Sequence, residues 1–409
     1  MLTKFQIDWK ILRLFLSSMF AFGLWIGSAQ ASVIFDTNPF PIVDPFGISP
    51  FWEWRTIETD HFRLNFPQEL SPIAQKAARY LEEAHTLLSP FLLWTPQAKT
   101  NVLLMDNQDQ ANGLTAPAAR IGIILWAALP FSESENAFYD DWLRLLVIHE
   151  YTHFLNMDPT RGIWKPLRLV FGDSLLPNAI LPPWMLEGLA VNAETRFTAA
   201  GRGRSSFYEM VLRAAILEKT LNTDHFVTLD RVHGENPYYP GGNTRYIFGY
   251  YLTREVSFEK MGILSYNSSY RIPFFINGNL ENTLSTSWND LWDEWLKKTQ
   301  KRISQDLAML QAQATTQEIP LTLRKHTLSN DITGVAASPD GNLLAFTRAS
   351  TEARQGLYLL RLNDAGTAPQ NLAEKMPERL NDKLSGVGIA FTPDSKSLVY
   401  SRLRRLDIY

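Results

Sequence analysis

The alternation of apolar and polar residues predicts several short strands in the first half of the chain. Residues 61–66 alternate between the two classes, which is typical of a half-buried strand. Two shorter apolar runs, at 102–105 and 121–126, predict further strands of a small sheet. The run at 121–126 is a candidate edge strand, to which an extended peptide could add by main-chain pairing. Asn112-Gly113, just before it, is expected to be a turn.

A second pattern, with apolar residues three and four positions apart, predicts helices. Ser71-Pro72 is a typical helix start, and the apolar residues that follow recur at helical spacing as far as Leu88. Further helices are expected around residues 138–157, 184–195, 205–219, 243–256 and 288–314. Strands followed by helices indicate an α+β fold, in which a small mixed sheet precedes a mainly helical part.

The last part of the chain has a different, repeated pattern. Ser338-Pro339-Asp340-Gly341 precedes a strand-like segment, and Thr392-Pro393-Asp394-Ser395 does so again 54 residues later. Self-similarity at such a period is typical of β-propeller blades. The segments resemble the Ser-Pro-Asp-Gly blades of TolB-like β-propellers over residues 326–409. Since only about one and a half units are present and a propeller needs about four blades, we expect a truncated all-β propeller segment, as in a truncated or split version of a longer protein.

The N-terminal 31 residues have the composition of an export signal. Lys4, Lys10 and Arg13 precede or flank an apolar run, and Ala29-Gln30-Ala31 matches the small-residue rule for signal cleavage. The alternative is an uncleaved membrane anchor, because the run is close to the shortest length that spans a bilayer. We expect cleavage, a periplasmic or secreted protein, and no membrane span after removal of the signal.

The composition of the chain excludes several kinds of chemistry. The net charge is −3 and no basic block occurs, so nucleic acid is not an expected partner. There is no cysteine, which excludes disulfides, thiol nucleophiles and cysteine-ligated metals. A metal site must therefore be built from histidine, aspartate or glutamate.

One motif in the chain indicates a metal site. His149-Glu150-Tyr151-Thr152-His153 lies within an apolar run that predicts a buried helix, so both histidines lie on one helical face, one turn apart. Two such imidazoles can bind one Zn²⁺, and Glu150 can serve as the general base. The motif arises by chance in about one chain of this length in a hundred, which favours zinc binding over ordinary core histidines.

A third ligand has to come from elsewhere, and Glu187 is the leading candidate. It lies near the start of the helix that Pro182-Pro183 begins, among apolar neighbours where an unpaired carboxylate is costly. Position alone leaves an alternative, in which Glu187 only interacts favourably with the helix dipole. Glu194, seven residues later, is either a hydrogen-bond partner of a ligating imidazole or a surface carboxylate. Gly201-Arg202-Gly203-Arg204 is expected to be a surface turn.

Taken together, these motifs resemble those of the gluzincin metallopeptidases, which include the aminopeptidase-like group. The resemblance rests on His149-Glu150-x-x-His153 and Trp184-x-x-Glu187-Gly188-x-Ala190, with 33 residues between the second histidine and Glu187. It covers roughly residues 50–300, and it implies a zincin-like fold with Glu187 as the third zinc ligand. The long gap is more similar to exported bacterial proteins that join a peptidase-like domain to a TolB-like propeller, and Asn192 replaces an aromatic residue frequent in aminopeptidases.

The resemblance also implies a catalytic tyrosine. Gluzincins have a Pro-Tyr-x-x-Gly segment whose tyrosine stabilises the oxyanion, and Pro237-Tyr238-Tyr239-Pro240-Gly241-Gly242 is similar to it. Tyr239 matches best, because Gly242 stands three residues later. Tyr238 is the second choice and Tyr246 the third, and half-buried aromatic packing is the alternative for all of them.

The combined prediction is an exported zinc-dependent peptidase that holds one Zn²⁺ per chain. We expect a signal peptide at 1–31, a gluzincin-like domain at 32–314, a linker at 315–325 and a partial propeller at 326–409. His149, His153 and Glu187 would hold the metal, Glu150 would act as the base, and the substrate would be a peptide or protein. The alternative from another class is a non-catalytic envelope scaffold, whose propeller binds an envelope protein and whose metal site is vestigial or structural. A third possibility is hydrolysis of a non-peptide amide.

Overall fold

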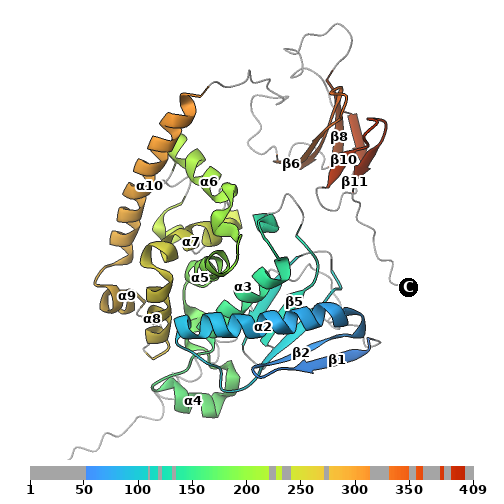
Figure 1. Ribbon diagram of the computed structural model, residues 1–409. Helices are drawn as coiled ribbons and strands as arrows, with labels where there is room; N and C mark the ends of the chain where they lie inside the picture. Colours follow the sequence, from blue (N-terminus) through green and yellow to red (C-terminus); the bar gives the residue numbers. More distant parts are fainter. Residues whose placement is uncertain are drawn as a thin grey trace, which may run out of the picture. The chain divides into compact units, whose positions relative to one another are not determined.

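The computed structural model describes residues 52–108, 111–117, 122–130, 135–220, 227–232, 241–270, 276–313, 331–349, 356–362, 378–381 and 388–400. The expected signal segment, the linker at 315–325 and Tyr239 lie outside these residues. Within them, the fold is a mixture of helices and small sheets, which confirms the predicted α+β class (Figure 1). No helix among the described residues is long and apolar enough to cross a membrane.

A five-stranded mixed sheet lies at the start of the described chain. Its strands are β1 (Trp54–Glu58), β2 (Phe62–Pro67), β3 (Thr100–Met105), β4 (Gly113–Ala116) and β5 (Gly122–Trp126). Their order in the sheet is β1-β2-β3-β5-β4. The three central strands run parallel, and the two outer strands pair antiparallel to their neighbours. The prediction that residues 121–126 form an edge strand is therefore wrong: β5 lies between β3 and β4, and β4, which begins at Gly113 of the expected turn, forms the edge of the sheet.

Two long helices pack against this sheet and against each other. They are α2 (Ser71–Leu92) and α3 (Trp142–Met157), and α3 contacts both β4 and β5. Every third or fourth residue of α2 is buried, as its apolar spacing predicts. In contrast, α3 is buried nearly all round, because the sheet covers one side and other helices cover the rest.

The remaining helices form the second part of this α+β unit (Figure 1). They are α4 (Trp164–Phe171), α5 (Pro183–Phe197), α6 (Ser206–Leu217), α7 (Thr244–Val256), α8 (Phe258–Ser268), α9 (Ile276–Leu284) and α10 (Trp288–Gln311). Helix α5 packs between α3 and α7. A Cβ atom on Gly188 would lie 2.2 Å from the backbone of Gly249, so only glycine allows α5 and α7 to approach this closely. The three helices α4, α8 and α9 were not predicted from the sequence.

The C-terminal segment forms two small antiparallel sheets. Strands β6 (Asp331–Ala337), β7 (Leu343–Ala349), β8 (Gly356–Arg361) and β9 (Glu378–Asn381) pair in chain order, and β10 (Ile389–Phe391) pairs with β11 (Leu398–Tyr400). The two repeated turns have the same hydrogen bonds. The hydroxyl of Ser338 donates to Asp340 at 2.6 Å, and the hydroxyl of Thr392 donates to Asp394 at the same distance. The sequence repeat therefore corresponds to a repeated local structure.

Candidate metal centre

Helix α3 presents the two motif histidines. Asp141 caps its N-terminus by accepting a hydrogen bond from the backbone N–H of Arg144 at 3.3 Å. Because the helical repeat places residues four apart on one face, the Nε2 atoms of His149 and His153 face each other at 3.2 Å. Both side chains are buried.

Glu187 joins these histidines from α5, as predicted. Its Oε2 atom lies 3.5 Å from Nε2 of His149 and 3.2 Å from Nε2 of His153. Among the described residues, these three side chains are the group of histidines and acids whose ligand atoms lie close enough together to bind one metal ion. The Glu187 side chain as a whole is 20% exposed, whereas its Oε2 atom is buried.

The geometry of the three ligand atoms fits a metal ion. Zinc–nitrogen and zinc–oxygen bonds of 2.0–2.1 Å at tetrahedral angles place two ligand atoms about 3.3 Å apart. The three distances in this protein are 3.2, 3.2 and 3.5 Å. Oε2 of Glu187 is also buried without a hydrogen-bond partner in the described part of the chain. A buried carboxylate oxygen that makes no hydrogen bond but faces two imidazole nitrogens is what a metal ligand requires.

Glu150 lies beside this group, at the boundary between α3 and β4. Its side chain is buried, and the hydroxyl of Thr115 lies 2.7 Å from its Oε2 atom and 2.9 Å from its carbonyl oxygen. A Cβ atom on Gly113 would lie 2.5 Å from its Oε1 atom. Strand β4 therefore holds the Glu150 carboxylate through a hydrogen bond from Thr115. The absence of a side chain at Gly113 leaves room for this carboxylate.

A second layer of polar residues supports His149. Glu194 is fully buried, and its Oε2 atom lies 2.9 Å from Nδ1 of His149, which excludes the alternative of a surface carboxylate. Arg202 begins a short 3₁₀ helix (Arg202–Arg204) and donates to Glu194 from its backbone N–H, its Nε and its Nη2, each at 2.9 Å. The expected surface turn is therefore wrong at Arg202, which is only 7% exposed, because its charge is neutralised by Glu194. His153 lacks such support among the described residues, since its buried Nδ1 atom makes no hydrogen bond there.

The charges in this centre strongly change the pKa values of its groups. Burial and the charge of Arg202 oppose protonation of His149, but Glu187 and Glu194 outweigh them and raise its pKa to about 9. Burial would raise the pKa of Glu194, but the charge of Arg202 and hydrogen bonds from His149 and Arg202 lower it to about 2. The pKa of Glu187 is also held well below its usual value, because the charge of His153 and contacts with both histidines outweigh burial. A metal ion that binds His149 must therefore displace a proton.

The formal charges of the buried residues favour a dication at this position. Glu150, Glu187 and Glu194 are formally negative and Arg202 is positive, and His149, with a pKa of about 9, carries a second positive charge while no metal is bound. Once a metal ion has displaced the proton of His149, two negative charges are in excess, which is costly in a largely buried site, and a divalent ion would cancel them. Two imidazoles and one carboxylate are also a known ligand set for catalytic zinc.

The predicted tyrosines are only partly within the described residues. Tyr238 and Tyr239 lie outside them. Tyr246, on α7, is half-buried, and its ring centroid lies 4.9 Å from the guanidinium carbon of Arg202. Of the three candidates, the structure therefore locates Tyr246 alone, next to the residues that support His149.

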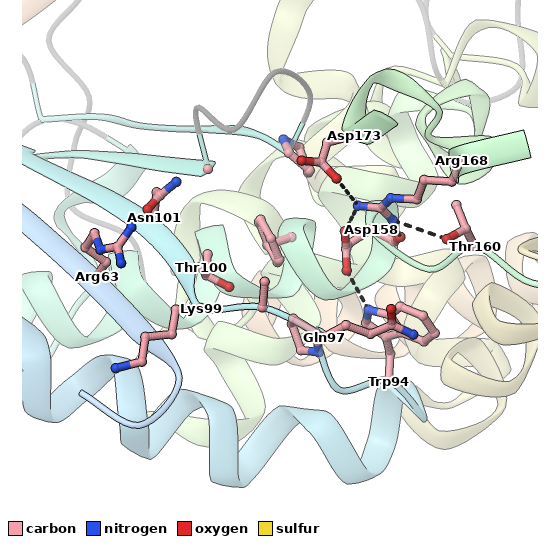
Figure 2. A pocket seen from close by; sticks show the side chains of 15 residues that line it. Arg63, Trp94, Gln97, Lys99, Thr100, Asn101, Asp158, Thr160, Arg168 and Asp173 are labelled. Carbon is pink, nitrogen blue, oxygen red and sulfur yellow. Dashed lines mark hydrogen bonds and ion pairs between the residues drawn. The ribbon is translucent and has the colours of Figure 1, made fainter. Parts of the chain in front are cut away.

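A separate cavity lies at the C-terminal end of α3 (Figure 2). It has a volume of about 530 Å³, and its polar lining includes Asp158, which accepts hydrogen bonds from Trp94 Nε1 at 2.7 Å and Arg168 Nη2 at 2.6 Å. None of His149, Glu150, His153 and Glu187 lines it. This cavity is therefore distinct from the candidate metal centre.

A comparison of the chain with models of known protein families finds no match. A search among curated proteins finds no match either. The candidate site is thus defined by its own residues and their geometry.

Proposed function

We propose that this protein is an exported zinc-dependent peptidase of the gluzincin type. The observation that carries the proposal is the convergence of His149, His153 and Glu187 beside the buried carboxylate of Glu150. A purely structural metal site needs no carboxylate next to its ligands, whereas a hydrolytic site needs a general base at that place.

Each residue has a defined part in the proposed reaction. His149, His153 and Glu187 hold the ion, and Glu194 orients His149 through Nδ1. A zinc ion in this set supplies Lewis-acid chemistry, lowering the pKa of a bound water from about 15.7 toward 7 and polarising a carbonyl group. Glu150 accepts the proton of the attacking water on its carboxylate and transfers it to the leaving amine. The oxyanion donor remains Tyr239, with Tyr238 and Tyr246 as the other candidates.

The position of the edge strand supports an extended peptide as the substrate. Within the described residues, β4 pairs with β5 on one side only, so its other edge can accept main-chain hydrogen bonds. Gly113 and Thr115 of this strand contact Glu150. A peptide that added to β4 would therefore pass the proposed general base with its backbone aligned along the strand.

The finer features of the fold prediction belong to the same proposal. A mixed sheet that packs on the motif helix, followed by helices that supply the third ligand, supports a zincin-like domain. The four-stranded antiparallel sheet β6–β9 and the repeated turns support a partial TolB-like propeller, which would bind an envelope protein. Export by the signal at residues 1–31 would place the protein in the periplasm or outside the cell.

The test combines metal analysis with a hydrolysis assay on purified protein. We expect about one zinc ion per chain and cleavage of an unstructured protein substrate. Glu150→Gln should keep the metal and lose hydrolysis by about 10²- to 10⁴-fold, the usual size of a general-base contribution. Equal hydrolysis by this variant would show that Glu150 is not the base. Tight zinc binding without cleavage of any member of a broad peptide library would favour the scaffold alternative.

A further inference from the structure

The segment that follows α5 packs back against this helix, and the side chain of its Arg202 is buried. The 3₁₀ turn Arg202–Arg204 brings the guanidinium of Arg202 to both oxygens of Glu194, with Nε on Oε1 and Nη2 on Oε2. The backbone N–H of Arg202 donates a third hydrogen bond to Oε1. This carboxylate is thus held by a planar fork and a main-chain donor, which together define its orientation.

The neighbouring glycines make this insertion possible. Gly201 has φ +92°, and a Cβ atom there would lie 2.6 Å from Cα of Thr195 in α5. A Cβ atom on Gly203 would lie 2.3 Å from the ring of Tyr250 in α7. The N–H of Gly203 donates to the hydroxyl of Thr195 at 3.1 Å. The turn is therefore packed closely against α5 and α7 at the position from which Arg202 reaches Glu194.

The Arg202 side chain also reaches the histidine that Glu194 supports. Its Nη2 atom lies 2.9 Å from Nδ1 of His149, and both nitrogens lie 2.9 Å from Oε2 of Glu194. One carboxylate oxygen accepts from both groups. His149 is thereby held with Nδ1 on the carboxylate and Nε2 directed at Glu187 and His153.

We infer that Arg202 is a positioning residue of the metal centre, which acts on the metal through Glu194 and His149. This inference rests on the metal-binding part of the proposed function. The contacts of Arg202 described above are with Glu194 and with Nδ1 of His149, which is not the ligand nitrogen, so its effect passes through the carboxylate that it holds. Loss of comparable supporting partners weakens metal binding about 10- to 100-fold.

Two opposite effects of removing Arg202 can be distinguished. A positive charge next to a dication site repels the ion, so removal of the charge alone would tighten metal binding. Loss of the fork leaves Glu194 buried with fewer partners and frees the His149 ring, which weakens binding. Positioning therefore predicts weaker binding, and a purely electrostatic role predicts tighter binding.

The experiment measures metal affinity and ligand geometry in the full chain. Zn²⁺ dissociation constants are determined by chelator competition, and the visible spectrum of the Co²⁺-loaded protein reports the ligand arrangement. The variants are Arg202→Met and Arg202→Lys, of which the second keeps the charge but loses the fork. Arg168→Met is the matched control, because Arg168 is also largely buried and ion-paired, to Asp158, but does not contact the metal group. Urea unfolding of each metal-free variant shows whether it folds.

We expect Arg202→Met to bind Zn²⁺ at least about 10-fold more weakly and to alter the Co²⁺ spectrum. The Zn²⁺ affinity of Arg202→Lys should lie between those of Arg202→Met and the wild type. Arg168→Met should change the stability of the protein but leave its Zn²⁺ affinity and Co²⁺ spectrum unchanged. Unchanged or tighter binding by Arg202→Met would overturn the inference. If Arg202→Met does not fold, the inference would be overturned by an Arg202→Lys variant whose Zn²⁺ affinity and Co²⁺ spectrum equal those of the wild type. Weaker metal binding in these variants together with an inactive wild type would leave the inference standing and reject the peptidase.

Discussion

Thr115 and Glu150 connect the edge of the sheet to the motif helix through the hydroxyl of Thr115, which lies 2.7 Å from the Glu150 carboxylate and 2.9 Å from its carbonyl oxygen. Thr115 belongs to β4 and Glu150 to α3, and the two residues are 35 positions apart in the chain. Within the described residues β4 pairs only with β5, so the strand that contacts the proposed general base also has the edge that we propose for the substrate. We therefore propose that this one strand links the position of the substrate to the position of the base.

Replacing Thr115 by valine should lower turnover while leaving the metal in place. Valine keeps the shape of the side chain but removes the hydrogen bond, and a hydrogen bond to a charged group contributes about 1.5–3 kcal/mol, or about 10- to 100-fold in rate. Turnover and zinc content are measured together. Thr115→Ser keeps the hydroxyl and serves as the control, with turnover near that of the wild type. Equal turnover of the valine variant would show that the hydroxyl does not orient the base.

Gly113→Ala should displace the Glu150 carboxylate. The added Cβ atom would lie 2.5 Å from Oε1, so either the side chain or the strand has to move. A shift of about 1 Å in a catalytic group can cost about 100-fold in rate, and we expect a loss of that order with normal zinc content.

Gly278→Ala is the matched control for this exchange. It lies in α9, has open space around the new Cβ atom, and should raise the free energy of unfolding by about 0.5–1 kcal/mol without changing turnover. If Gly113→Ala retained full turnover, the close packing of β4 on Glu150 would have no catalytic role.

Removal of a metal ligand should abolish stabilisation by zinc. A ligand that binds only the folded state at about 1,000 times its dissociation constant raises the free energy of unfolding by about 4 kcal/mol. We expect this gain, and its loss on addition of a chelator, for the wild type but not for His153→Ala or Glu187→Gln. Thermal unfolding with and without zinc measures it. His61→Gln alters a histidine outside the group, and zinc should stabilise this variant as much as the wild type. Full zinc occupancy in His153→Ala would contradict the proposed ligand set.

His85 should make the stability of the protein depend on pH below neutrality. It is buried in α2, its Nδ1 atom lies 2.7 Å from the hydroxyl of Tyr151, and its ring stacks on His61 at 3.6 Å. Burial and the charge of His61 lower its pKa below the usual value of 6.5, while Glu82 partly opposes this. The unfolded chain therefore binds the proton more readily than the folded protein, and stability falls as the pH drops below about 6.5.

The measurement is urea unfolding at pH 7.5, 6.5 and 5.5 for the wild type and His85→Gln. One proton taken up on unfolding changes the free energy of unfolding by at most about 1.4 kcal/mol per pH unit. The wild type should lose more stability than the variant on acidification, because the variant lacks this titrating group. The same pH dependence in both proteins would show that His85 does not contribute.

The helices of the site were predicted well from the sequence, and strand β4 was not. The spacing of apolar residues and the proline start located α3 and α5 to within a few residues. In contrast, β4 has four half-buried residues without a clear alternation, and it becomes a strand through pairing with β5. A strand defined mainly by its partner leaves little signal in its own residues.

The role of Arg202 was missed for a related reason. Glycine and arginine in alternation are typical of exposed turns, and Arg202 is buried because Glu194 neutralises it. A possible signal was the acid at position 194 within an otherwise apolar helix, which requires a buried partner of opposite charge. The sequence does not indicate which of its arginines supplies that partner.

The sequence alone determined that His149 and His153 share one face of a buried helix with Glu150 beside them, because helical hydrogen bonds are local and repeat every 3.6 residues. Only the tertiary structure decided that Glu187 meets both histidines, that Thr115 and Gly113 border Glu150, and that Arg202 holds Glu194. Those distances depend on how α3, α5 and β4 pack, and this packing is the joint result of many contacts between residues far apart in the chain.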